Sequence, residues 1–188
     1  QNWIYLYMRL DQELYQPLFF YYPSGMRLSL AAAILNEELN ELGREYGLKN
    51  IAVVAHSVGG LIARSFINRY ASDNENYVRL FVTFATPWGG FEMADASQRH
   101  PHKSIPAWEE LGTQSSFIQT TMNEPLPAHI RHYIFYGTND IMTSDKATDE
   151  RAVSCAVQSL AFDCTHDSIL IKRDVFEQFS DILKKELK

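Results

Sequence analysis

Cysteine is scarce in this chain, and this limits the architectures that the chain can adopt. Cys155 and Cys164 are the only two cysteines in 188 residues, too few for a scaffold held together by disulfides. Two thiols also fall short of the four ligands of a structural zinc site. The sequence leaves two states open for the pair, a single bridge in an oxidising compartment or two separate thiols.

Surplus basic charge and long apolar runs are missing as well. The 17 basic side chains are outnumbered by 23 acidic ones, for a net charge of -6, so no basic stripe can neutralise nucleic-acid phosphates. No apolar run approaches the roughly 18 residues that cross a bilayer. Hydrophobic residues make up 46% of the chain, which is typical of a globular protein. We expect residues 1–188 to form one domain.

Apolar periodicity predicts helices that alternate with strands. The helices are expected near residues 3–14, 28–46, 61–70 and 175–187, and Gly47 should end the second of them. Buried strands are expected at 51–55, 78–85 and 133–136, and the aromatic run at 18–22 also has strand character. This alternation predicts an α/β fold with a mostly parallel sheet and flanking helices.

One long interval, residues 88–128, lacks strand character. It carries four prolines and one helix-like piece at 115–122, which is typical of a functional insertion. Because it follows a predicted strand, we expect it over the carboxyl ends of the strands, as a lid or cap. Its candidates for a substrate pocket are Trp88, Phe91, Trp108 and Phe117. The alternative is that these side chains pack the insertion onto the body.

The strongest chemical signal is a serine between a predicted strand and a predicted helix. The segment reads Ile51-Ala-Val-Val-Ala-His-Ser-Val-Gly-Gly-Leu-Ile-Ala-Arg64. In such a context a sharp, strained turn exposes the serine hydroxyl above a sheet. Strand and helix pass closely there, so we expect that side chains larger than Ala55 and Gly59 would collide. The alternative is an ordinary serine at a helix N-terminus.

Together with this motif, three further segments resemble the α/β-hydrolase family, in particular the bacterial lipase and PGAP1-like serine esterase group. Phe84-Ala-Thr-Pro-Trp-Gly-Gly90 resembles the turn that follows the next strand in those lipases. Tyr136-Gly-Thr-Asn-Asp140 resembles the strand end that carries the acid. Phe162-Asp-Cys-Thr-His-Asp-Ser-Ile-Leu170 resembles the loop that carries the histidine. The order serine, aspartate, histidine is the order of this fold.

The resemblance implies a serine hydrolase that cleaves carboxylic esters, of a lipid or another acyl compound, through an acyl-enzyme. Ser57 would be the nucleophile, His166 the general base and Asp140 the acid that orients the histidine. The same triad would serve a thioesterase, an acyltransferase or a peptidase. Such chemistry requires no metal and no other cofactor.

The assignment of the acid has alternatives. Asp145 and Asp149 follow Asp140 closely, and Ile141-Met-Thr stands where the family more often has Gly-Val-Val. Asp163 and Asp167 flank the histidine and are interpreted as loop or capping carboxylates.

The other five histidines carry no motif. His56 is interpreted as packing beside the turn, without a catalytic proton to move. His100 and His102 lie in the insertion and lack a third metal ligand, so we expect them to be solvated. His129 and His132 precede a strand and are expected at the surface.

Acyl transfer also requires two N–H donors for the developing oxyanion. The backbone N–H of Val58, the residue after the serine, is expected to be one of them. No His-Gly loop supplies the second, and the chain begins at Gln1 in a predicted helix without an initiator methionine or a secretory signal. We therefore expect a hydrolase that lacks its first strands, with the second donor outside this chain.

Two interpretations from other classes stay open. One is a non-catalytic hydrolase-like protein that binds a lipid or a partner, and the other is an interaction domain that uses residues 88–128. The missing donor motivates the first, and the second leaves Ser57 unexplained. The expected partner is a small acyl ester or a lipid, with peripheral contact to a lipid surface, and the expected location is the cell envelope or outside the cell.

Overall fold

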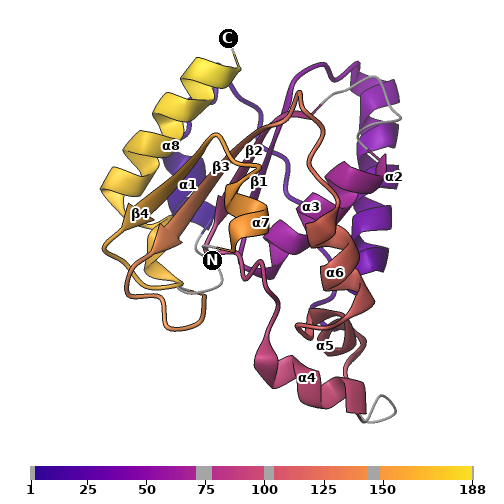
Figure 1. Ribbon diagram of the computed structural model, residues 1–188. Coiled ribbons are helices and arrows are strands. Elements are labelled where there is room, and N and C mark those ends of the chain that lie inside the picture. The colour runs from indigo at the N-terminus through magenta and orange to yellow at the C-terminus, as the bar shows by residue number, and fades with distance from the viewer. Residues whose placement is uncertain (1–2, 71–77, 100–103, 144–148, 188) are drawn as a thin grey trace.

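The computed structural model describes residues 3–70, 78–99, 104–143 and 149–187 (Figure 1). Within these ranges a four-stranded parallel sheet runs in the order β1-β2-β3-β4, with helices on both faces. The strands are β1 (Ile51–His56), β2 (Val78–Phe84), β3 (Arg131–Gly137) and β4 (Gln158–Phe162). The helices are α1 (Trp3–Arg9), α2 (Leu28–Tyr46), α3 (Val58–Tyr70), α4 (Glu92–Arg99), α5 (Pro106–Leu111), α6 (Ser116–Asn123), α7 (Glu150–Val153), the short 3₁₀ helix η2 (Ser168–Leu170) and α8 (Arg173–Glu186).

The sheet separates two apolar cores. Successive side chains of β2 point to opposite faces, so Phe81 lies in one core while Leu80 and Val82 lie in the other. Helices α2 and α3 cover the first face, and α1 and α8 cover the second (Figure 1). Because all four strands are parallel, their carboxyl ends meet at one edge of the sheet, where loops can bring distant residues together.

Most of the predicted elements are confirmed. Helix α2 has the predicted bounds, and Gly47 ends it in the left-handed region at φ 62°, with its N–H donated to the carbonyl of Gly43. The three predicted strands lie where the apolar runs place them, and the helix after Ser57 begins at Val58. The first helix is shorter than expected and ends at Arg9.

The aromatic run at 18–22 forms no strand, so that prediction was wrong. Leu18, Phe19 and Tyr21 are 55%, 47% and 86% exposed, and no described strand pairs with this segment. Its rings pack on one another and on neighbouring elements instead: Phe20 stacks on Tyr22 with the ring centroids 5.5 Å apart, and the Phe19 ring lies 5.9 Å from that of Tyr7 on α1. Aromatic residues favour strands mainly through packing against cross-strand neighbours, and this segment has none.

His132 is buried, contrary to the prediction that it lies at the surface. It is 0% exposed, stacks on Phe81 at 4.5 Å between ring centroids and meets the edge of Trp88 at 5.5 Å. Burial lowers the pKa of His132 to about 3, so the ring is neutral in the core. His129 is half-buried.

The interval at 88–128 forms α4, α5 and α6, which group beyond one end of the sheet (Figure 1). Helix α5 packs against α2, and α6 packs against α3. The buried Arg64 of α3 donates from Nε to the Thr121 carbonyl at 2.9 Å and from Nη2 to the Glu124 carbonyl at 3.1 Å. Asn68 donates to the same two carbonyls. These bonds tie the end of α6 to the helix that follows Ser57.

Cys155 and Cys164 are free thiols in the structure. Cys164 is buried beside β3, and burial raises the pKa of its thiol to about 11. In the described ranges, no helix combines the length and the apolar character that spanning a membrane requires.

Candidate active site

Ser57 is the single residue between β1 and α3. Its φ of 54° lies in the left-handed region, which is costly for a residue with a side chain and is typical of strained functional turns. The backbone N–H of Ser57 donates to the carbonyl of Phe84, the last residue of β2, at 2.9 Å. The predicted strand–turn–helix geometry at this serine is therefore present.

The close passage of strand and helix lies one residue later than the sequence predicts. A Cβ atom at Gly59 would lie 3.9 Å from the Cβ of Ala55, an ordinary contact, so the prediction that any larger residue collides there was wrong for alanine. A Cβ atom at Gly60 would instead lie 2.0 Å from Oγ1 of Thr86. The closest approach to the start of α3 is therefore made by Thr86, which follows β2, and not by Ala55 on β1.

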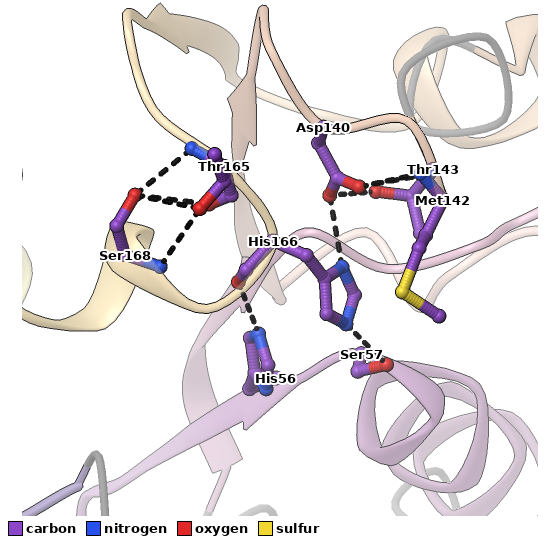
Figure 2. Close-up of polar contacts among 8 residues, drawn as sticks. All are labelled: His56, Ser57, Asp140, Met142, Thr143, Thr165, His166 and Ser168. Carbon is purple, nitrogen blue, oxygen red and sulfur yellow. Dashed lines mark hydrogen bonds and ion pairs between the residues drawn. The ribbon is translucent and has the colours of Figure 1, made fainter.

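Three residues that are far apart in the sequence meet beside this turn (Figure 2). His166 Nε2 lies 2.9 Å from Ser57 Oγ, and His166 Nδ1 lies 2.9 Å from Asp140 Oδ2. Ser57 follows β1, Asp140 follows β3, and His166 lies in the loop between β4 and η2. With its proton on Nδ1, the His166 ring donates to Asp140 and accepts the hydroxyl proton of Ser57.

Asp140 is fully engaged as an acceptor. Its Oδ1 accepts the N–H of Met142 at 2.9 Å and that of Thr143 at 3.1 Å, and its Oδ2 accepts the Thr143 hydroxyl as well as His166. Burial by itself favours the neutral acid, but the hydrogen bonds from Thr143, His166 and Met142 outweigh it and hold the pKa of Asp140 below its ordinary value. A buried carboxylate beside the imidazole results.

Of the two alternative acids, the structure describes Asp149, and the partners of its carboxylate among the described residues do not include His166. Asp149 instead caps α7 and pairs with Arg151 at 2.8 Å, and Asp163 accepts a hydrogen bond from Asn139. Asp145 lies outside the described residues. Thr143 supplies two of the four donors to Asp140, and nothing in the sequence pattern identified it, because the departure from the family at Ile141-Met-Thr placed it outside the motif.

Replacing Thr143 with valine is expected to lower the free energy of unfolding at pH 7 by about 1.5–3 kcal/mol, the range for a hydrogen bond to a charged group. The folded-state pKa of Asp140 is depressed. The stability that its ionised form contributes is therefore present above the ordinary pKa and is lost as the pH falls through the lowered one. The penalty should thus shrink in acid, once the pH falls below the ordinary pKa of an aspartate.

Urea unfolding of Thr143→Val and the parent protein, at pH 7 and in acid, measures how the penalty changes with pH. Thr138→Val is the matched control, because its hydroxyl donates to the uncharged Phe162 carbonyl at 3.2 Å. The control penalty should not change with pH. A Thr143→Val penalty as constant as that of the control would contradict the role assigned to Thr143.

The predicted oxyanion donor lies at the start of a helix. Val58 is the first residue of α3, and the first N–H groups of a helix have no acceptor within it. Its N–H also benefits from the positive end of the helix dipole. The described residues include no His-Gly loop of the kind that supplies the second donor.

The four pocket candidates divide into two pairs. Trp88 and Phe117 are buried, at 0% and 4% exposure, within the core that holds α2 and α3, which favours the packing interpretation for them. Trp108 on α5 is 38% exposed, and Phe91 is half-buried at the border of the same core. Only the second pair has appreciable exposed surface.

Two of the remaining histidines, His100 and His102, fall outside the part of the chain that the structure describes. Where the structure describes side chains, no three His, Cys, Asp or Glu residues gather as they would around a metal ion. His56 does contact the site: its Nε2 lies 2.9 Å from the backbone carbonyl of His166, a contact that sequence patterns did not indicate.

Residues 26–164 match the family described as alpha/beta hydrolase of unknown function (DUF915). The chain belongs to this α/β-hydrolase family. The predicted fold class and the resemblance of the sequence motifs to α/β-hydrolases are thereby confirmed. No curated protein sequence gives a significant match.

Solved α/β structures are similar to this hydrolase at low sequence identity. The lin2722 gene product of Listeria innocua superimposes with a TM-score of 0.64 at 16% identity, over 85% of this chain and 68% of that one. A thermophilic esterase from Thermogutta terrifontis gives 0.63 at 14% identity, over 100% of this chain and 86% of that one. A monoacylglycerol lipase from Paleococcus ferrophilus gives 0.59 at 13% identity, over 86% and 75%. At such identities the likeness concerns the fold.

Proposed function

We propose that this α/β-hydrolase cleaves carboxylic esters with Ser57 as nucleophile, His166 as general base and acid, and Asp140 as the orienting carboxylate. The observation that carries the proposal is the unbroken chain from Ser57 Oγ through the His166 ring to Asp140, with 2.9 Å at each of its two contacts. The esterase and lipase names of two structural neighbours support an ester as substrate.

The first half of the reaction forms an acyl-enzyme. Ser57 Oγ attacks the ester carbonyl carbon while its proton passes to His166 Nε2, and Asp140 stabilises the imidazolium. The negative charge moves to the carbonyl oxygen, where the Val58 N–H donates to it. The bond from carbon to the alcohol oxygen then breaks, and His166 returns the proton to that oxygen.

The second half releases the acid. Water attacks the acyl carbon, gives its proton to His166 Nε2, and the bond to Ser57 Oγ breaks as His166 protonates that oxygen. Each step needs the ring of His166 to stay between Ser57 and Asp140. The four donors to Asp140 keep that carboxylate ionised and in place for both halves.

We assign an apolar acyl or alcohol group to the substrate. Ile141 and Met142 follow Asp140 directly and are 98% and 52% exposed. In the view of Figure 2, the Met142 side chain runs from beside Asp140 in the direction of Ser57. Exposed apolar side chains beside a catalytic centre favour an apolar ligand over a charged one.

A fluorophosphonate probe tests the proposal. Ser57 Oγ should displace fluoride from phosphorus, and peptide mass spectrometry should find the label on Ser57. Labelling should be lost in His166→Ala, because the hydroxyl is activated only when its proton can leave. Labelling on another residue, or equal labelling in His166→Ala, would overturn the assignment. A series of p-nitrophenyl esters of increasing chain length then measures the preference for the acyl group.

A further inference from the structure

His56 is the last residue of β1 and lies directly before Ser57. Its ring packs against that of His166, with centroids 4.7 Å apart and planes inclined by 48°. Its Nε2 lies 2.9 Å from the backbone carbonyl of His166, and Figure 2 marks this contact with a dashed line. The residue before the proposed nucleophile thus contacts both the ring and the backbone of the proposed base.

The direction of this hydrogen bond follows from its acceptor. A carbonyl oxygen can only accept, so Nε2 of His56 carries the proton and donates it. Burial lowers the pKa of His56, and the bond to the His166 carbonyl offsets part of this effect. The ring is therefore neutral near pH 7, with its proton on Nε2, and adds no positive charge next to the imidazolium of His166.

The loop that carries His166 has contacts on two sides. Towards β3 and Asp140, the N–H of Asn139 donates to the Cys164 carbonyl at 3.1 Å. Within the loop, the N–H of Thr165 donates to Ser168 Oγ at 2.9 Å, which shapes the turn but anchors it to nothing else. The bond from His56 ties the loop to β1, the strand that positions Ser57.

We propose that His56 is a positioning residue, whose Nε2–H holds the His166 backbone at the distance from Ser57 that proton transfer requires. This inference rests on the proposed function and assigns His56 no proton of the reaction. A displacement of about 1 Å between reacting groups can cost about 100-fold in rate. The role should therefore appear in kcat rather than in substrate binding.

Two variants at this position separate the hydrogen bond from the volume of the ring. His56→Leu keeps much of the volume and removes the donor, and is expected to lower kcat by about 10- to 100-fold with KM changed less than about threefold. His56→Gln places an amide N–H near the position of Nε2 and should recover kcat to within about threefold of the parent protein. His129→Leu is the control, because this half-buried histidine precedes β3, at the opposite end of that strand from Asp140.

The outcomes distinguish this inference from the proposed function. If Ser57 of the parent protein takes the fluorophosphonate, the proposed function holds whatever the His56 variants show. A kcat of His56→Leu equal to that of the parent, or a loss in His56→Gln as large as in His56→Leu, would overturn the positioning role. If His56→Leu fails to fold, His56→Asn replaces it, since its shorter amide cannot reach the carbonyl, and the same comparison with His56→Gln decides.

Discussion

Replacing Ser57 with alanine should lower kcat/KM for a p-nitrophenyl ester by at least about 10⁴-fold, because the triad acts as one unit. The hydroxyl contacts His166 at 2.9 Å, and alanine leaves the imidazole with no proton to accept and no nucleophile to activate. The fold should persist, since alanine and serine meet a similar cost at the observed φ of 54°. Ester hydrolysis and thermal unfolding of the same preparation measure both effects.

His166→Ala and the double variant Ser57→Ala/His166→Ala provide the sharper comparison. Each should fall to nearly the same residual rate as Ser57→Ala, because removing one member of the unit already removes its action. Ser65→Ala is the matched control: this serine lies on α3, is 2% exposed and has no hydrogen-bond partner for its hydroxyl among the described residues. Its turnover should stay that of the parent protein. Losses that multiply in the double variant would show that Ser57 and His166 act independently.

The members of the candidate triad could be predicted because each is marked by its own neighbours in the sequence. Ser57 stands where a strand pattern meets a helix pattern, and Asp140 follows a strand through Gly137. Parallel strands bring such positions to one edge of the sheet, so the order of the motifs implies their proximity. The bounds of α2 were predictable for a similar reason, since its periodicity and Gly47 are local signals.

The errors concern residues whose state depends on neighbours from elsewhere in the chain. The residues at 18–22 have strand propensity, but a strand also needs a partner, and none of the described strands lies beside them. His132 looks polar in sequence, yet Phe81 and Trp88 enclose it. Neither enclosure nor pairing can be derived from spacing along one segment.

The supporting residues of the site were missed for the same reason. The Thr143 hydroxyl reaches Asp140 because the chain turns back after that residue. His56 contacts the site because the His166 carbonyl, 110 positions away in the sequence, lies within hydrogen-bond distance of its ring. Supporting contacts of this kind depend on loop conformation, which the sequence motifs do not specify. They are also what keeps the reacting groups within the narrow range of distances that catalysis needs.

Gly60→Ala should destabilise the protein by more than about 3 kcal/mol, at the upper end of the cost of overpacking. The new Cβ would lie 2.0 Å from Oγ1, 2.6 Å from Cγ2 and 2.9 Å from Cβ of Thr86. Thr86 is 0% exposed and precedes Pro87, so it has little room to move. Any adjustment must shift the start of α3, and with it Ser57 and the Val58 N–H. Urea unfolding and ester hydrolysis should therefore decline together.

Gly59→Ala is the control one residue earlier on the same helix. Its Cβ would make an ordinary contact at 3.9 Å with Ala55, and alanine favours a helix over glycine by up to about 1 kcal/mol. This variant should be as stable as the parent or slightly more stable. Thr86→Gly removes the three atoms that a Cβ at Gly60 would meet, so Gly60→Ala should cost less in that background. Equal costs in both backgrounds would show that the collision lies elsewhere and that Thr86 does not set the path of α3.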